Sequence, residues 1–228
     1  MHNDSDAAPR QTALPIAASI SQNDGIFYRS ACNDAVAGAV RKAAEDSHFR
    51  AVRLIGPARS GKTRLLKTLA REMANAHYVC ADAAPSCLRG DVTLHVLDRL
   101  DDAIDERRVF HYINSVRESG AALIVADRGE RRFSLPDLAS RLESFPCVFM
   151  PPPDAELLQT LLAERFAARQ LRPSATVLRF IAGKIERDYA APEKAVHALD
   201  AASLALGAPV TRALATSILP SLGKHISL

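Results

Sequence analysis

The sequence predicts an α/β fold, in which a parallel sheet of five strands is followed by a small all-α region. Three observations support this prediction. Five short apolar runs alternate with helix-like stretches between residues 51 and 150. Residues 56–63 form a glycine-containing loop between the first of these runs and a helical stretch. After Pro151-Pro152-Pro153, only helical patterns follow.

Size and composition describe an ordinary globular protein. The chain has 228 residues, of which 48% are hydrophobic, and a formal net charge of +3. This length can bury a substantial core, and the mild positive charge permits contact with nucleic acid without arguing for it. No apolar run approaches the roughly 18 residues that a membrane helix needs, and the N-terminus is polar and acidic. We therefore expect no signal peptide and no membrane span, and a cytoplasmic location.

The four cysteines, Cys32, Cys80, Cys87 and Cys147, are scattered along the chain without the spacing of metal ligands. Cys80 and Cys147 lie in apolar runs. We expect these two to be buried thiols in a reducing compartment.

The loop matches the pattern G-x-x-x-x-G-K-[ST] of a phosphate-binding loop. In that motif the glycines let consecutive backbone N–H groups point at the phosphates. Lys62 would reach the β and γ oxygens, and the Thr63 hydroxyl can ligate Mg²⁺. Its context fits, because residues 51–55 predict a buried strand and residues 64–76 a helix. The candidate nucleotide-binding residues are Gly56, Pro57, Ala58, Arg59, Ser60, Gly61, Lys62, Thr63 and Arg64.

The elements around this loop follow from periodicity and from breakers. Residues 35–45 predict a helix, with Asn33 or Asp34 as its N-cap. Residues 81–91 contain Pro85 and Gly90 and leave room for one helical turn at most. The other predicted strands are 77–80, 92–98, 121–126 and 147–150, and the other predicted helices of this part are 103–119 and 135–143.

Two acids end predicted strands. Asp98 closes the strand 92–98, where an acid can order the Mg²⁺ shell through Thr63 and water. A simple strand-end acid that starts a turn is the alternative. Asp127 follows the strand 121–126. Because ligands of parallel sheets bind at the carboxyl ends of the strands, these acids and the loop 56–63 should share one edge.

The C-terminal part is predicted to be all helical. The helices are expected at 154–169, 174–187, from Pro192 to Leu206, and 211–219. Leu178, Ile181 and Ile185 would share one face of the second of these helices. The predicted organisation is a flexible tail over 1–20, an α/β nucleotide-binding core over 21–150, and a helical lid over 151–228.

A phosphate-loop core followed by a small helical lid resembles the AAA+ ATPases. Three segments narrow the resemblance to the DnaA replication initiators and, more closely, to the Hda family of DnaA-homologous regulators. They are Phe110-His111-Tyr112-Ile113-Asn114 through Gly120, then Leu123-Ile124-Val125-Ala126-Asp127-Arg128, and Leu135-Pro136-Asp137-Leu138-Ala139-Ser140-Arg141-Leu142. The resemblance covers roughly residues 20–215.

Two expected features of an initiator are missing from the pattern. DnaA carries a C-terminal helix-turn-helix domain, whereas this sequence ends at Leu228 after the predicted lid. DnaA also has extra helices before its Mg²⁺-acid strand, for which residues 81–91 are too short. On both counts we expect a regulator rather than an initiator.

The resemblance implies a role for several residues. The loop 56–63 would hold ADP or ATP with Mg²⁺, and Asp98 would support the metal. Asp127 would be the sensor at the end of the fourth strand. Arg141 matches the arginine finger that reaches the nucleotide of a neighbouring subunit, although a surface arginine on a short helix is the alternative.

A short apolar segment in the polar N-terminal tail also fits the Hda family. Gln11, Leu14 and Ile16 match the form Q-x-x-L-x-[hydrophobic], which in that family binds the sliding clamp of DNA polymerase III. Such a peptide offers one amide anchor and two apolar side chains, and binds at about micromolar affinity on its own. The alternative is a tail that docks on its own domain.

Two departures from the AAA+ pattern predict weak self-hydrolysis. The second acid that normally positions the attacking water is replaced by Arg99, with Asp101 and Asp102 two and three positions further on. The lid's sensor arginine falls at Ala190, and Arg187 lies three residues earlier.

The leading hypothesis is therefore an Hda-like negative regulator of replication initiation. The sliding clamp recruits it, DNA is reached indirectly through the clamp, and Arg141 promotes hydrolysis of ATP bound to DnaA. The alternatives are an AAA+ ATPase that hydrolyses its own ATP to remodel or load a DNA-bound partner, and a small-molecule kinase. The bound nucleotide, self-association and direct DNA contact are left open.

Overall fold

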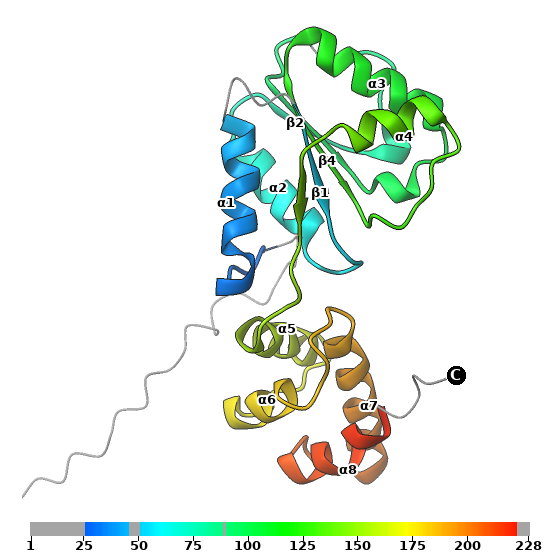
Figure 1. Cartoon of the computed structure of the whole chain (residues 1–228). Helices are drawn as coiled ribbons and strands as arrows, with labels where there is room; N and C mark the ends of the chain where they lie inside the picture. Colours follow the sequence, from blue (N-terminus) through cyan, green and yellow to red (C-terminus); the bar gives the residue numbers. More distant parts are fainter. Residues whose placement is uncertain (1–25, 46–50, 89, 223–228) are drawn as a thin grey trace, which may run out of the picture.

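The computed structural model describes residues 26–45, 51–88 and 90–222, and a sheet-containing part and a helical part follow one another along the chain (Figure 1). The first part contains α1 (Ala31–Glu45), β1 (Ala51–Ile55), α2 (Lys62–Glu72), β2 (Ala76–Cys80), the 3₁₀ turn η1 (Ala81–Ala83), β3 (Leu94–Asp98), the 3₁₀ turn η2 (Leu100–Asp102), α3 (Glu106–Ser119), β4 (Ala122–Asp127), α4 (Pro136–Glu143) and β5 (Cys147–Phe149). The second part contains α5 (Ala155–Ala168), α6 (Ala175–Ala182), α7 (Ala191–Leu206) and α8 (Arg212–Leu222).

The five strands form one parallel sheet in the order β2-β3-β4-β1-β5. The predicted five-stranded parallel sheet is confirmed. Every connection between neighbouring parallel strands has to cross over the sheet, which is why the strands alternate with helices along the chain. The carboxyl ends of β1, β3 and β4 lie side by side and place the phosphate loop, Asp98 and Asp127 at one edge.

Helices cover both faces of the sheet (Figure 1). On one face, α1 and α2 pack against the sheet through residues such as Val40 and Leu66, which meet Leu54 of β1. On the other face, α3 and α4 pack through residues such as Ile113 and Leu138. β3 is buried throughout because both faces of this strand are covered.

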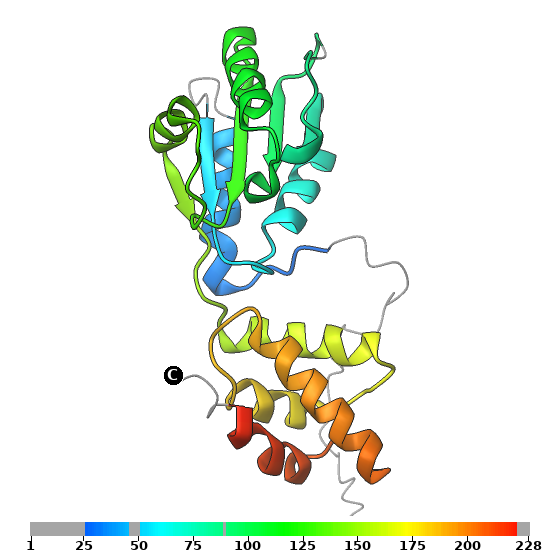
Figure 2. The ribbon, with the colours of Figure 1, turned by 90° about the vertical axis from the view of Figure 1, so that its right-hand side faces the viewer.

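The lid helices have a core of their own. Leu162 and Phe166 of α5 pack with Ile181 of α6, Leu199 of α7 and Ala215 of α8, and all five are essentially inaccessible. Figure 2 shows this helical group below the sheet, joined to it by the chain that leaves β5. The lid is therefore a second hydrophobic unit rather than an extension of the sheet layers.

A single carboxylate joins the starts of two helices. Asp154, the N-cap of α5, accepts a hydrogen bond from the backbone N of Leu157 at 2.8 Å. Its other oxygen accepts from the Ser30 hydroxyl and, at 3.1 Å, from the backbone N of Cys32 in the first turn of α1. Asp154 therefore caps a core helix and a lid helix together, at the junction between the two parts.

Three predicted helix boundaries differ from the structure by four or more residues. The helix predicted over 64–76 ends at Glu72, because Met73 is extended and Asn75 turns left-handed before β2 begins at Ala76.

The first helix begins at Ala31 rather than 35, and Asn33 lies inside it, where its side-chain oxygen accepts from the Ser30 N–H at 2.9 Å. In a capping box, the side chain of the third helical residue accepts from the backbone N of the N-cap, and Asn33 and Ser30 stand in this relation. Neither Asn33 nor Asp34 is therefore the N-cap. The predicted helix 174–187 ends at Ala182, because Gly183 follows and is a poor helix former. Ile185 still packs on the lid core from the loop beyond.

The prediction for Cys147 was wrong. Cys147 is exposed, because β5 is an edge strand of three residues that pairs with β1 alone. Cys80 is half-buried and is a free thiol. None of the helices in the described ranges is long and apolar enough to cross a membrane.

Candidate nucleotide site

The phosphate loop connects β1 to α2 through backbone angles that few residues adopt. Gly61 caps α2 with φ at 90°, and Arg59 has φ at 65°. At Gly56, a Cβ atom would lie 2.5 Å from Cβ of Met150, so no side chain fits there. The glycines therefore let the chain curl tightly over the end of the sheet, as the motif requires.

Two polar groups in the loop are poised for an anion. Lys62 donates to the carbonyl oxygens of Gly56 and Pro57 at 2.5 and 2.9 Å, and burial lowers its pKa. The Ser60 side chain is 3% exposed, and its hydroxyl oxygen has no hydrogen-bond partner among the described residues. A buried hydroxyl without a partner costs free energy, which an anionic ligand would recover. These residues fit a bound phosphate group.

A cavity of about 280 Å³ opens beside the loop, between the core and the lid. The loop and α2 form one wall, the segment before α1 forms a second wall, and the lid forms the third. Among the described residues, four cationic side chains and no carboxylate line the cavity, so it suits an anion. The lining residues are Phe27, Tyr28, Asn33, Arg59, Ser60, Gly61, Lys62, Thr63, Arg64, Leu157, Leu161, Arg165 and Tyr189.

An ion pair closes one side of this cavity. The Arg64 guanidinium binds Glu164 of α5 with two hydrogen bonds of 3.1 and 2.5 Å. The Glu164 side chain is 5% exposed, and the Arg64 guanidinium carbon also lies 5.8 Å from the centroid of the Tyr28 ring. The hydrogen bond to Glu164 is the main reason why the pKa of Arg64 is raised, and burial opposes it. The pair fixes the lid against the first turn of α2.

The proposed Mg²⁺ acid is held firmly at the end of β3. Asp98 is 1% exposed and accepts hydrogen bonds from the Tyr78 hydroxyl at 2.6 Å and from the backbone N of Arg99 at 2.9 Å. Burial, followed by this hydrogen bond to Asp98, raises the pKa of Tyr78, so Tyr78 stays protonated and donates. Asp98 does not line the cavity, and each of its oxygens retains accepting capacity. Its role as a metal support stays a prediction.

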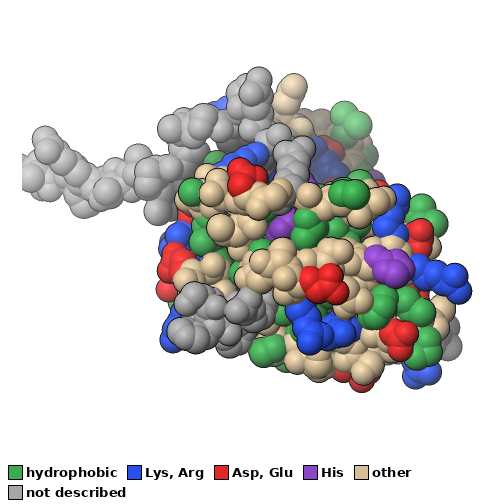
Figure 3. Space-filling view, turned by 90° about the horizontal axis from the view of Figure 1, so that it is seen from above, with side chains coloured by type: hydrophobic (Ala, Val, Ile, Leu, Met, Phe, Trp, Pro, Cys, Tyr) green, Lys and Arg blue, Asp and Glu red, His purple; other side chains and the backbone are tan. Residues whose placement is uncertain are grey.

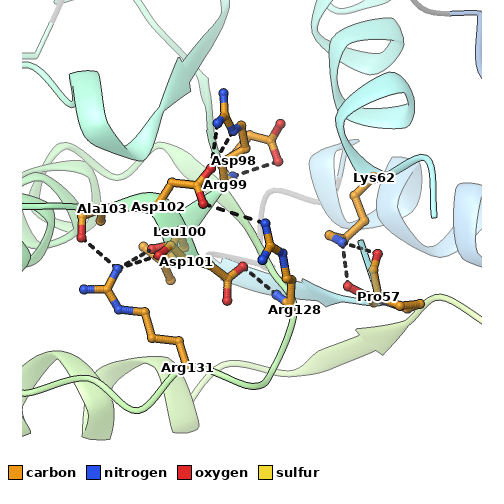
Figure 4. Close-up of polar contacts among 11 residues, drawn as sticks. Pro57, Lys62, Asp98, Arg99, Leu100, Asp101, Asp102, Ala103, Arg128 and Arg131 are labelled. Carbon is orange, nitrogen blue, oxygen red and sulfur yellow. Dashed lines mark hydrogen bonds and ion pairs between the residues drawn. The ribbon is translucent and has the colours of Figure 1, made fainter. Parts of the chain in front are cut away.

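The acids that follow Asp98 accept hydrogen bonds from nearby arginine residues, through a side chain at Asp102 and through a backbone N at Asp101 (Figure 4). Arg99 has left-handed backbone angles, and its side chain binds Asp102 at 2.8 Å. Asp101 accepts a hydrogen bond from the backbone N of Arg128 at 2.8 Å. Arg131 locks the same turn by donating to the carbonyl oxygens of Asp101 and Ala103, each at 2.7 Å, and to Glu106. Asp102 is therefore paired with arginine side chains, whereas Asp101 is held in place through one of its two carboxylate oxygens.

Asp127, the predicted sensor, is buried against the core. Its Oδ2 accepts from Arg53 of β1 at 2.6 Å, and its Oδ1 accepts from the backbone N of Gly129 at 2.6 Å. The side chain is 1% exposed. Arg53 is a partner that the sequence did not reveal, since a charged residue in a buried strand looks like an interruption. The sensor role of Asp127 stays a prediction.

Arg141 lies on α4, on the face of the sheet opposite to α2. Its side chain is half-buried, and it makes no hydrogen bond or ion pair with any described residue. A guanidinium without an internal partner is available to another molecule. Its role as an arginine finger stays a prediction, and so does the clamp role of Gln11, Leu14 and Ile16, which lie outside the described residues.

The lid places the expected sensor positions as follows. Ala190 is the N-cap of α7, so the expected sensor position itself carries no basic side chain. Arg187 is exposed in the preceding loop and does not line the cavity. The lid residue that does bring a positive charge to the cavity is Arg165 of α5. Sequence reasoning missed it, because its helical position alone does not tell which wall it forms.

Comparison with known proteins supports this architecture. No protein-family model matches the chain. Over 118 residues it is 29% identical to the chromosomal replication initiator protein DnaA of Thermomicrobium roseum. That alignment covers 50% of this chain and 25% of the initiator, so the chain spans about a quarter of the curated relative that it matches.

Solved structures give a wider match. Domain III of the Thermotoga maritima replication initiation protein DnaA superposes with a TM-score of 0.62 at 16% identity, covering 87% of this chain and 95% of that one. A replication initiator DnaA bound to AMPPCP and single-stranded DNA gives 0.57 at 15% identity, covering 76% and 63%. This is the fold of the AAA+ domains of DnaA and RuvB. The Thermotoga maritima RuvB Holliday junction branch migration motor gives 0.54 at 14% identity, covering 83% and 69%.

Proposed function

We propose that this protein is an Hda-like regulator, which holds a nucleotide in its AAA+ core and promotes hydrolysis of ATP bound to DnaA. In this proposal the sliding clamp recruits it through residues 11–16, and the initiator is left in its inactive ADP form. The observation that carries the proposal is a contrast within the chain. Its phosphate loop is intact and borders a cavity, whereas Arg99 stands where a second acid is expected, Asp102 pairs with Arg99, and Asp101 accepts from the backbone N of Arg128.

Nucleotide holding is supported by the loop and the cavity. The N-terminus of α2, Lys62 and the buried Ser60 hydroxyl offer donors to phosphate oxygens. The apolar side chains of Phe27, Leu157 and Leu161 line the same cavity and suit a base. The structurally similar DnaA is bound to AMPPCP, which supports ADP or ATP as the ligand here. A Mg²⁺ ion would be held by Thr63 and Asp98 and would neutralise phosphate charge.

Weak self-hydrolysis is supported by the neighbourhood of Asp98. A residue that positions an attacking water needs an available acceptor near the phosphate. Arg99 stands at the expected position, carries the wrong charge and binds Asp102. Asp101 already accepts a hydrogen bond from the backbone of Arg128.

Action on a partner is supported by Arg141. A guanidinium that stabilises charge on a transferring phosphoryl group accelerates hydrolysis by about 10³- to 10⁵-fold in systems that use one. Arg141 has no internal partner among the described residues and lies on the other face of the sheet from the chain's own phosphate-loop helix. It is therefore better placed to serve a nucleotide held by another subunit than its own.

Direct binding to nucleic acid has less support. In the view from the end opposite the lid, the described positive and negative side chains are interspersed rather than gathered into a patch of one sign (Figure 3). Contact with DNA through the clamp fits this distribution better than a basic binding surface on that end.

The test is hydrolysis of DnaA-bound ATP in the presence of clamp loaded on DNA. We expect Arg141→Ala to abolish the stimulation and Arg117→Ala to leave it unchanged. Arg117 is a matched control, because it is an exposed arginine of α3 on the same side of the sheet. Gln11→Ala should remove the clamp dependence. Unchanged stimulation by Arg141→Ala would contradict the proposal.

The second candidate is an ATPase that hydrolyses its own ATP, as a motor of the RuvB type would. The likeness of the fold to RuvB favours it, and the occupied acids after Asp98 disfavour it. Turnover by the isolated protein near ~1 s⁻¹ or above, abolished by Lys62→Ala, would replace the regulator with this candidate.

A further inference from the structure

One stripe of α5 lines the nucleotide cavity. Leu157, Leu161 and Arg165 are spaced by four residues, so they follow one another along a single face of the helix. Two of them are apolar and the third is cationic. The stripe therefore changes from apolar to positively charged along the cavity, as an adenine nucleotide changes from base to phosphate.

Two anchors fix which end of the stripe faces the phosphate loop. Asp154, before the first turn of α5, binds Ser30 and Cys32 at the start of α1. Glu164, one residue before Arg165, binds Arg64 in the first turn of α2. Since the N-terminus of α2 is the phosphate end of the loop motif, Arg165 lies toward the phosphates and Leu157 lies away from them.

The charge of Arg165 is only partly neutralised. Its Nε lies 3.2 Å from Oε2 of Glu193 in the first turn of α7. The same carboxylate also accepts from Arg169 at 3.0 Å, and Arg169 has a second partner in Asp200 at 3.6 Å, so Arg165 shares Glu193 with another arginine. The Arg165 guanidinium donates no hydrogen bond to another described residue, and its side chain is 34% exposed. Glu193 therefore orients Arg165 while leaving its donors available to a ligand.

We propose that Arg165 is the lid residue that contacts the phosphates of the bound nucleotide, in place of the arginine absent from the start of α7. The inference rests on the nucleotide site proposed above and adds a residue to it. Within the described part of the lid, Arg165 is the cationic side chain that lines the cavity. The lid and the phosphate loop would then contact the same phosphates from two walls of the cavity. Phosphate binding would therefore stabilise this position of the lid.

The test compares ADP with adenosine on the full chain by calorimetric titration. A phosphate contact predicts that Arg165→Gln weakens ADP about tenfold to a hundredfold and changes adenosine less than about twofold. Arg165→Lys, which keeps the charge, should lose less than Arg165→Gln. The wild-type affinity for ADP should fall more steeply with salt than that of Arg165→Gln.

The matched control is Arg179→Gln, which removes an exposed lid arginine on α6 outside the cavity lining. It should leave both affinities within about twofold of wild type. Equal losses of ADP and adenosine on Arg165→Gln would overturn the inference, because they would indicate a base contact or a damaged lid. Unchanged ADP binding by Arg165→Gln would also overturn it. If the wild-type chain did not bind ADP, the proposed nucleotide site itself would fail.

Discussion

Two neighbouring regions at the carboxyl edge of the sheet differ in how their charges are used. Around the phosphate loop, the buried hydroxyl of Ser60 has no hydrogen-bond partner in the described part of the chain, and cationic side chains line a cavity. Around η2, every acid from Asp98 to Asp102 already has a donor from within the chain. The first region, called the open region below, offers donors to an anion. In the second, called the closed region, the acids already accept hydrogen bonds from within the chain.

This difference separates binding from catalysis within one fold. The phosphate loop supplies affinity through backbone donors and a lysine, and it needs no base. Hydrolysis in addition needs an acceptor placed to orient the attacking water, and in the η2 region Arg99 stands at the position expected for that acid and pairs with Asp102. A chain can therefore keep the AAA+ fold and its ligand while contributing a catalytic group only to a partner.

The largest effect, on stability, is expected at the ion pair between Arg64 and Glu164 beside the phosphate-loop cavity. Arg64→Ala removes the guanidinium from a carboxylate that is 5% exposed, and we expect a loss of about 3–5 kcal/mol in the free energy of unfolding. The pair Arg99–Asp102 in the closed region is the control, because its side chains are 56% and 33% exposed. Arg99→Ala should cost less than about 1 kcal/mol in urea denaturation. Similar costs for the two variants would remove the contrast between the regions.

The next largest effect concerns affinity rather than stability. Lys62→Ala should weaken ADP about a hundredfold, because a charge-assisted contact to phosphate is lost. Lys62 donates to two carbonyl oxygens of its own loop, but the burial of its charge also costs free energy. We expect these two effects largely to cancel, so the midpoint of urea unfolding should change little. Isothermal titration measures the first quantity, and Lys67→Ala on the same helix is the control. An undiminished affinity would show that the open region does not bind phosphate through Lys62.

Stability is expected to depend on pH through His95, a buried residue of β3. Burial, and to a lesser degree His77, lowers the pKa of His95 to about 4, and His95 lies 2.8 Å from the Tyr112 hydroxyl. Its unfolded value is 6.5, so stability is full above about pH 6.5 and falls progressively down to pH 4, where the loss is complete. We expect a loss of about 3 kcal/mol over this range.

Chemical denaturation at several pH values measures this slope. His95→Gln should flatten it, whereas His111→Gln should not, because His111 is exposed on α3. An unchanged slope in His95→Gln would assign the pH dependence to other groups.

The smallest effect is expected at the support of Asp98. Tyr78→Phe removes one donor from a buried carboxylate and should cost about 1 kcal/mol of stability. Tyr28→Phe is the control, since the Tyr28 hydroxyl makes no hydrogen bond with a described residue. If Asp98 supports Mg²⁺, Tyr78→Phe should also weaken the dependence of ADP affinity on Mg²⁺. A stability equal to that of wild type would mean that the Tyr78 contact contributes nothing net.

The sheet and the loop could be predicted because their signals are local. Buried parallel strands are continuous apolar runs, and the loop needs glycine where the backbone turns left-handed or meets Met150. Boundaries were less certain. The helix 174–187 stopped early because one glycine outweighed an apolar pattern that Ile185 keeps satisfying from a loop.

Of the candidate site, only the residues that belong to local sequence motifs could be predicted; their distant partners could not. Arg53 meets Asp127, and Arg64 meets Glu164, across separations of 74 and 100 residues. No local pattern records such partners, because each depends on how the sheet and lid are placed. Arg165 was missed for the same reason, and the exposure of Cys147 followed from its strand lying at the sheet edge.

The shared cap at Asp154 has a consequence for how the chain matures. Ser30 and Asp154 are 124 residues apart, and five strands lie between them. Translation at about 5–20 residues per second makes Asp154 on the order of ten seconds after Ser30. Helix α1, the first helix in the described residues, therefore receives its final cap only after the whole sheet has left the ribosome. The α/β core is thus complete only once Asp154, the N-cap of the first lid helix, has been made.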